Sequence, residues 1–318
     1  MKRITILLAA LLFSAAALAQ SWPAKPVRVI VSLPAGSATD IIGRSLAERL
    51  SAQLGQPFVV ENRIGASGSI AQGFVAKADP DGYTILVHSS SGTVVPFTVP
   101  DLQFDVLRDF SGITMLANIP NVLAVAPGRG FRTVKDLVAF GKANPGKLNY
   151  ATIGTGSATH LNAERFRLGA GIQATQVPYK GTPEALTDLI AGRVDYCFCP
   201  VSNVGPMARD GKLLALAVGS SKRASGMPDL PTTEEAGVPN SAYNFYVGLS
   251  VPSQTPRDIV KKLHAETVKA LQSPQMKDRY QKLGVDAQIF TPEEFDDYLR
   301  AEVKSNGELV KAAGIKVK

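Results

Sequence analysis

A serine and a histidine that share one glycine-rich loop are the residues of this chain best placed for chemistry. In Gly154-Thr155-Gly156-Ser157-Ala158-Thr159-His160 the serine precedes the histidine by three positions. A hydrolase would use Ser157 as the nucleophile and His160 as the base, but the nucleophile-elbow pattern G-x-S-x-G is absent. We therefore interpret Ser157 as a helix cap and His160 as a packed or ligand-facing neutral imidazole, because the start of a helix disfavours the charged form.

The same loop does not fit a nucleotide site. A dinucleotide-binding loop would need Gly or Ala at position 159, where the sequence has Thr159. It would also need an acidic residue after the next strand, where Pro178-Tyr179-Lys180 stands. The phosphate-binding pattern G-x-x-x-x-G-K-[ST] does not occur either. An oxidoreductase or a nucleoside triphosphatase is therefore disfavoured.

The elements expected around the loop predict an anion-binding site. A short apolar strand ends at Ala151, and a helix begins at Ser157. The first turn of a helix has unpaired backbone N–H groups, and the helix dipole favours negative charge there. The residues by themselves leave open whether this loop binds an anion, catalyses a reaction or only turns the chain.

The rest of the chain repeats the order strand, loop, helix, which predicts an α/β fold with ligand loops at the carboxyl ends of parallel strands. We expect strands at 27–32, 58–60, 83–87, 122–126, 173–177, 194–199, 213–218 and 244–251. Polar loops follow at 34–40, 88–92, 154–160 and 179–182. No low-complexity linker and no short repeat is apparent.

Helix starts are marked by capping residues. Thr39 or Asp40 is placed to cap the first helix, whose apolar residues recur every four positions until Gly55. Thr133 and Asp136 form a capping box. In the C-terminal third we expect hydroxyl caps followed by proline at Thr255-Pro256, Ser273-Pro274 and Thr291-Pro292.

Composition and charge bound the class of protein. Of the 318 residues 45% are hydrophobic, and the formal net charge is +7, or +5 without Lys2 and Arg3. The positive residues are scattered, so we expect no nucleic-acid partner. The three histidines have no metal-ligand spacing, so we expect no metal and no cofactor. We expect a monomer.

The first 19 residues read as a secretory signal peptide. Lys2 and Arg3 precede an apolar run, and Ala17-Leu18-Ala19 fits a cleavage site, so we place the cut near Ala19 and the protein in the periplasm. Cys197 and Cys199 are the only cysteines. On one face of a strand they could be two packed thiols or a tight disulfide, and we favour the thiols because so small a ring is strained.

The order of many short motifs resembles the Bug-type periplasmic solute receptors of tripartite tricarboxylate transporters, over essentially the whole mature chain. The motifs are Trp22-Pro23 to Val27-Arg28, Pro34 to Asp40 with Arg44, Val60-Glu61-Asn62-Arg63, Asp79-Pro80-Asp81-Gly82-Tyr83-Thr84, Phe104-Asp105 to Asp109-Phe110, Gly154-x-Gly-Ser-x-x-His160-Leu161, Val177-Pro178-Tyr179-Lys180-Gly181, Gly192-Arg193-Val194-Asp195 and Pro231-Thr232 to Glu235-Ala236-Gly237.

This resemblance implies a two-lobed periplasmic binding protein of the Venus-flytrap type, each lobe a mixed, mostly parallel sheet flanked by helices. We assign residues 20–120 and 248–318 to one lobe and 121–247 to the other. The expected ligand is a small organic carboxylate, delivered to a membrane permease. Alternatives are a ligand-sensing partner of a two-component sensor kinase and, less favoured, a serine hydrolase.

The resemblance also implies that a loop from each lobe holds the carboxylate, largely through backbone N–H groups. The predicted donors are Gly36, Ser37 and Ala38 in one loop and Gly156, Ser157 and Ala158 in the other. The residues expected to shape specificity are Thr39, Ser89, Ser90, Thr155, Tyr179 and Asp195; an equally weighted alternative for Asp195 is a strand-end cap. The family commonly has Pro-Gly-Gly where this chain has Ala35-Gly36-Ser37, so a positive φ at Ser37 would cost about 1 to 2 kcal/mol.

Overall fold

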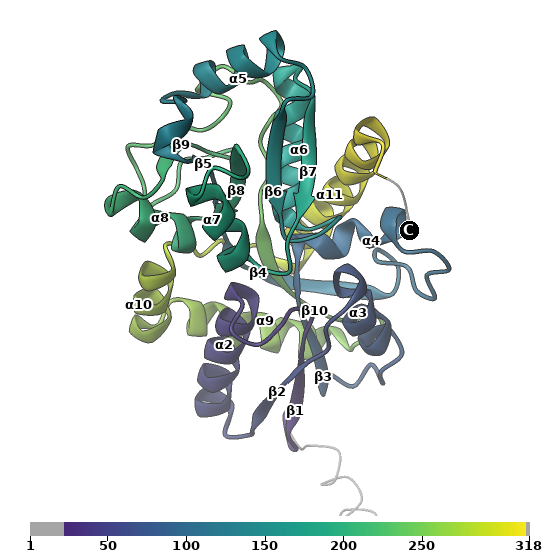
Figure 1. Cartoon of the computed structure of the whole chain (residues 1–318). Coiled ribbons are helices and arrows are strands. Elements are labelled where there is room, and N and C mark those ends of the chain that lie inside the picture. Colours follow the sequence, from purple (N-terminus) through teal and green to yellow (C-terminus); the bar gives the residue numbers. More distant parts are fainter. Residues whose placement is uncertain (1–21, 316–318) are drawn as a thin grey trace, which may run out of the picture.

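The computed structural model describes residues 22–315 and builds them around two five-stranded sheets. The predicted signal peptide at 1–19 lies outside the described residues. Figure 1 shows the two sheets in separate parts of the molecule, with the first below and the second above.

The first sheet contains β1 (Val27–Val31), β2 (Phe58–Asn62), β3 (Thr84–Ser89), β4 (Phe110–Asn118) and β10 (Tyr246–Pro252). Their order is β2-β1-β3-β10-β4. Strand β1 pairs in parallel with β2 and β3, whereas β10 runs antiparallel to both of its neighbours, β3 and β4. Four of the five strands therefore point the same way.

The second sheet contains β5 (Asn121–Val125), β6 (Leu148–Thr152), β7 (Ala174–Pro178), β8 (Tyr196–Pro200) and β9 (Leu214–Val218). Their order is β7-β6-β8-β5-β9, and only β5 runs against the others. Each sheet is thus mixed and mostly parallel, with one reversed strand in the same place. The strands expected from β-branched and apolar runs are all present, with ends shifted by one or two residues.

The chain crosses between the sheets twice. Residues 119–120 join β4 to β5, and residues 219–245 join β9 back to β10. Each sheet has helices packed on it, and the hydrophobic core divides into clusters that follow the two sheets. The predicted two-lobed α/β solute-binding fold is confirmed.

The longer helices are α2 (Ala38–Leu54), α3 (Ser69–Ala76), α5 (Val134–Ala143), α6 (Ala158–Ala170), α7 (Thr182–Ile190), α8 (Val201–Arg209), α9 (Arg257–Leu271), α10 (Pro274–Leu283) and α11 (Pro292–Ala313). Helix α11 packs against β4 of the first sheet and against α6 of the second. In Figure 1 it rises from the lower part of the molecule along α6. The last long helix therefore connects the two lobes.

The caps explain where the helices begin. Thr133 with Asp136 and Thr291 with Glu294 form capping boxes, and Ser273 caps α10, as predicted. Two predictions were wrong. Ser37, not Thr39 or Asp40, caps α2 because its hydroxyl accepts the N–H of Asp40. Helix α9 has no side-chain cap, because it begins at Arg257 with Pro256 in the cap position, and Thr255 lies one residue before it.

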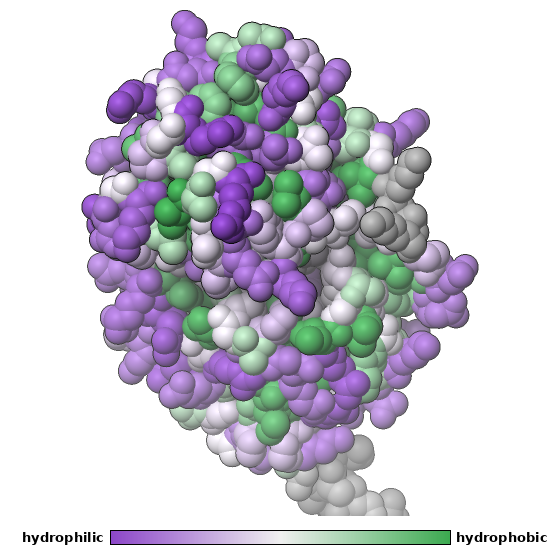
Figure 2. All heavy atoms as spheres, in the orientation of Figure 1, coloured by the Kyte–Doolittle hydropathy of each residue, from purple (hydrophilic) through white to green (hydrophobic). Residues whose placement is uncertain are grey.

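The surface is polar over most of the face shown in Figure 2, where apolar side chains gather only in small separate patches. Among residues 22–315, no helix combines the length and the apolar character that crossing a bilayer requires.

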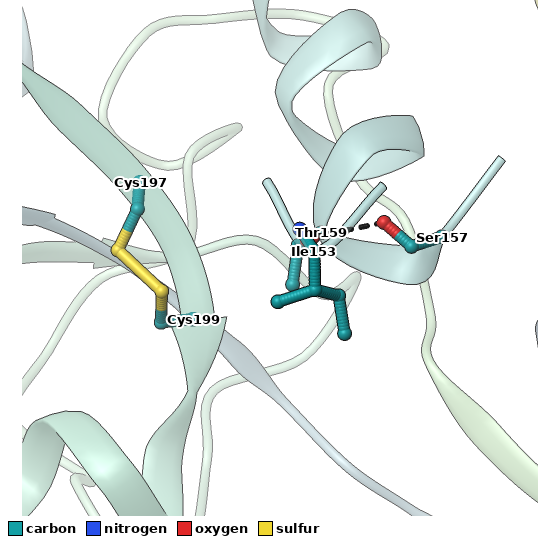
Figure 3. Close-up of a disulfide and its surroundings, with 5 residues drawn as sticks. All are labelled: Ile153, Ser157, Thr159, Cys197 and Cys199. Carbon is teal, nitrogen blue, oxygen red and sulfur yellow. Dashed lines mark hydrogen bonds between the residues drawn. A yellow bond between two sulfur atoms is a disulfide. The ribbon is translucent and has the colours of Figure 1, made fainter. Parts of the chain in front are cut away.

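A disulfide joins Cys197 and Cys199, so the prediction of two packed thiols was wrong (Figure 3). Both residues lie on β8, and residues two apart on a strand point to the same face. Their Cα atoms are 5.7 Å apart, within the range that a disulfide spans. The bridge is buried in the second lobe.

Candidate functional site

Two loops with the same four residues each begin a long helix, one in each lobe. Gly36-Ser37-Ala38-Thr39 leads from β1 into α2, and Gly156-Ser157-Ala158-Thr159 leads from β6 into α6. The expectation that the chain contains no short repeat was therefore wrong, since Gly-Ser-Ala-Thr occurs twice and at equivalent places. Both copies follow the carboxyl end of a parallel strand, where α/β sheets bind ligands.

The first copy is held by a carboxylate in the first turn of its own helix. Asp40 accepts the N–H of Gly36 at 2.9 Å, the guanidinium of Arg44 at 3.0 Å and the side-chain amide of Asn62 at 2.7 Å. Burial raises the pKa of Asp40, but these hydrogen bonds outweigh burial and hold the pKa below its usual value. Asp40 therefore stays ionised and fixes the shape of the loop.

Backbone geometry removes the strain that Ser37 was expected to cause. Gly36 has a φ of +80°, whereas Ser37 has a φ of −68°. The left-handed position thus falls on glycine, which adopts it without cost. Ser37 is an ordinary N-cap residue.

The second copy is held in the same way by a histidine. Nδ1 of His160 accepts the N–H of Gly156 at 3.1 Å, and Gly156 has a φ of +76°. The ring is buried and stacks on Tyr150. Burial lowers the pKa of His160, so the imidazole is neutral at pH 7 with its proton on Nε2. His160, the third residue of α6, thus fixes the N–H of Gly156 as Asp40 fixes that of Gly36.

Ser157 is fully engaged as a cap. Its hydroxyl donates to the carbonyl of Gly154 at 2.7 Å and accepts the N–H of His160 at 3.3 Å. The hydroxyl of Thr159 lies 3.0 Å from that of Ser157, a contact drawn as a dashed line in Figure 3. The Thr159 hydroxyl also accepts the N–H of Ile153. Because the only proton of Ser157 goes to a carbonyl and Nδ1 of His160 is occupied by Gly156, the pair has no nucleophile–base geometry.

The amides that remain free differ partly from those predicted. The N–H groups of Gly36 and Gly156 are used by Asp40 and His160, and those of Ser37 and Ser157 go to the carbonyls of Pro34 and Gly154. In these two turns, four amides have no hydrogen-bond partner among residues 22–315: those of Ala38 and Thr39 in α2 and of Ala158 and Thr159 in α6. Thr39 also has a fully buried hydroxyl without a partner among the described residues.

The turn of α6 packs against the first lobe. Ala38 and Ala158, the first residues of the two helices, pack against the same hydrophobic cluster. A Cβ added at Gly156 would lie 3.4 Å from the hydroxyl of Ser67, which belongs to the first lobe. A Cβ at Gly36 or Gly154 would instead meet open space. The site is therefore assembled from both lobes.

The predicted serines and Thr155 lie near these turns in different settings. Ser89, the last residue of β3, and Ser90, which follows it, are both buried; Ser89 bonds to Ser91, and Ser90 accepts from the hydroxyl of Tyr243. Thr155 is exposed and lines a cavity of about 500 Å³ together with His160.

Tyr179 and Asp195 are committed to structural bonds. Tyr179 follows β7, but its hydroxyl donates to Asp188 at 2.9 Å, and burial with this bond raises the pKa of Tyr179 to about 12. Asp195 precedes β8 at the opposite end of the sheet from Gly154. There it accepts the N–H of Asn149 and pairs with Arg129. The structure thus favours the strand-end cap for Asp195 and removes this residue from the site.

Sequence reasoning missed Ser67 and the holding roles of Asp40 and His160. Ser67 lies in η2 (Ala66–Gly68) with a φ of +56°, between Gly65 and Gly68. These glycines follow β2, so the rule that selected the other loops would have found this one. No group of His, Cys, Asp and Glu side chains in residues 22–315 could hold a metal ion.

Comparisons with known proteins agree with this fold. Residues 42–315 match the model of the "Tripartite tricarboxylate transporter family receptor". Protein BugT of Bordetella pertussis is 34% identical over 302 residues, covering 94% of this chain and 93% of BugT.

Two solved structures are similar over nearly their whole length. R. palustris Rpa4515 with adipate superposes with a TM-score of 0.82 at 32% identity, covering 94% of this chain and 100% of that one. MatC from Rhodopseudomonas palustris with bound malate gives 0.78 at 29% identity, covering 91% and 100%. Members of this family are periplasmic solute receptors and not enzymes. The chain belongs to the receptor family of the tripartite tricarboxylate transporters.

Proposed function

We propose that this protein binds a small organic carboxylate in the periplasm and delivers it to the membrane permease of a tripartite tricarboxylate transporter. The observation that carries the proposal is the pair of first turns, one from each lobe, with free amides at Ala38, Thr39, Ala158 and Thr159. Helix N-termini with free N–H groups favour anions, and a carboxylate can accept from both turns at once. The adipate and malate seen in two relatives support this class of ligand.

The proposed ligand set is a revision of the predicted one. Ala38, Thr39, Ala158 and Thr159 donate through their backbone, and the buried hydroxyl of Thr39 is a further donor. Gly36, Ser37, Gly156 and Ser157 shape the turns. Ser67 borders the site from the first lobe. We further propose that the lobes consist of residues 20–120 with 248–318 and of residues 121–247, and that they close on the ligand.

A thermal-shift screen of the mature protein tests the carboxylate. A ligand at 100 times its Kd that binds only the folded state adds about 2.7 kcal/mol to the free energy of unfolding. We expect dicarboxylates and related acids to raise the melting temperature, while their neutral diamides at equal concentration do not. Stabilisation by a sugar or a cation, with none by any acid, would overturn the proposal.

Delivery to a permease needs a separate test. Deleting the gene should abolish uptake of the radiolabelled acid, and expression of the permease should be unchanged. Loss of gene induction with uptake intact would instead identify a sensing role and refute delivery.

A further inference from the structure

The two Gly-Ser-Ala-Thr turns differ at the residue that follows them. Asp40 and His160 occupy the same position, three residues after the capping serine, and each accepts the N–H of the glycine before that serine. In both turns the serine hydroxyl accepts the N–H of this same residue, at 3.2 and 3.3 Å. The turns are therefore matched in backbone and capping, and they differ in charge.

The turn of α2 already contains an anion. The Asp40 carboxylate has only 3% of its side chain exposed, and it lies in the first turn of the helix. Its cation, Arg44, is 48% exposed, and its guanidinium also reaches Asn62. Since the positive end of the helix dipole already faces Asp40, a second carboxylate there would meet a like charge.

The turn of α6 has no acidic residue in its first turn. His160 must be unprotonated at Nδ1 to accept the N–H of Gly156, so it adds no charge at neutral pH. Tyr150, which stacks on the ring, is neutral as well. The nearest acid on the helix is Glu164, one turn further on, where it is bound by two guanidinium N–H groups of Arg167 and by the hydroxyl of Tyr150.

We propose that the turn of α6, and not its copy in α2, takes the charge of the ligand's carboxylate, and that His160 is the positioning residue that holds Gly156 while keeping this turn neutral. The N–H groups in the turn of α2 then donate either to a less charged part of the ligand or to the remaining lone pairs of the same carboxylate. Ligand would dock on the second lobe first, and the first lobe would close on it. This inference rests on the proposed carboxylate-binding function.

A matched pair of substitutions isolates the charge. His160→Asn and His160→Asp have nearly the same size, and each offers an oxygen to the N–H of Gly156. The carboxylate of His160→Asp would accept the N–H of Gly156 as Asp40 accepts that of Gly36, but it would have no counterpart of Arg44 and Asn62. We therefore expect His160→Asp to melt at a lower temperature than His160→Asn, and binding is compared at a temperature where both variants are folded. By isothermal titration with an acid that stabilises the wild type, His160→Asp should raise Kd about tenfold to a hundredfold relative to His160→Asn, because it puts a like charge within about 6 Å of the ligand.

Two further variants complete the test. His160→Phe removes the acceptor for Gly156 and should weaken binding at least about tenfold, and recovery of affinity in His160→Asn shows that the acceptor is what matters. Asp40→Asn should change Kd far less than His160→Asp does. Two results would overturn the inference and leave the proposed function standing. One is an equal Kd for His160→Asp and His160→Asn. The other is a gain in affinity on Asp40→Asn that exceeds the difference in affinity between those two variants. If no acid binds the wild type, both fail.

Discussion

Replacing Ala158 by proline would delete one proposed ligand contact and almost nothing else. Ala158 is the first residue of α6, where proline is well tolerated because its φ fits and the missing N–H has no partner within the helix. Ser157 has a φ of −70° and a ψ of 159°, which is the conformation that the residue before proline prefers. The chain already uses proline at this position in α10 and α11.

The size of the effect follows from the type of bond that is lost. A hydrogen bond to a charged group contributes about 1.5 to 3 kcal/mol. At about 1.4 kcal/mol per factor of ten, Ala158→Pro should raise Kd roughly tenfold to 150-fold. Unfolding stability should stay unchanged or rise by up to about 1 kcal/mol, because proline restricts the unfolded chain.

Isothermal titration and thermal melts of the ligand-free protein measure both quantities. Ala158→Ser is the control, since it adds bulk at the same place and keeps the amide. Ala38→Pro tests the other turn in the same way, because Ser37 has the matching ψ of 158°. Wild-type affinity in Ala158→Pro, with unchanged stability, would refute the role of this amide.

Three other predictions concern stability. Burial lowers the pKa of His88 from 6.5 to about 4, so the unfolded chain binds a proton that the folded protein does not, and stability should fall by about 3 kcal/mol as pH drops from 6.5 to 4; urea melts across this range should show a steeper decline than those of His88→Gln, and parallel curves would contradict it. Ser157→Ala should cost about 1 to 2 kcal/mol through the lost cap, while any trace hydrolysis of nitrophenyl esters stays the same. Reduction of the Cys197–Cys199 bridge should cost no more than about 2 kcal/mol, because it closes a very short loop; a larger drop in melting temperature with a phosphine reductant would show that the bridge supports the core.

Much of the fold could be predicted from local residue patterns, because the interactions that start a helix or favour a strand involve residues close together in sequence. Valine and isoleucine runs marked β1 and β3, and Thr133 with Asp136 marked the start of α5 through two short hydrogen bonds. Thr255 shows the limit of such signals. A hydroxyl residue before proline caps a helix only where proline is the first helical residue, and here α9 begins one residue later, at Arg257.

The sequence by itself determined that Ser157 caps a helix in a glycine loop, because spacing alone excludes a nucleophile elbow and a nucleotide loop. It also determined the strand-loop-helix order that puts such loops at the edges of two sheets. Which amides stay free was not evident from the loop pattern, since it depends on side-chain geometry: the N–H of Gly36 is taken by Asp40 and that of Gly156 by His160, and Asp40 is itself held by Asn62 of β2. The approach of Ser67 to Gly156 and the distance of Asp195 from the site likewise depend on how strands far apart in sequence pair, which residue spacing does not encode.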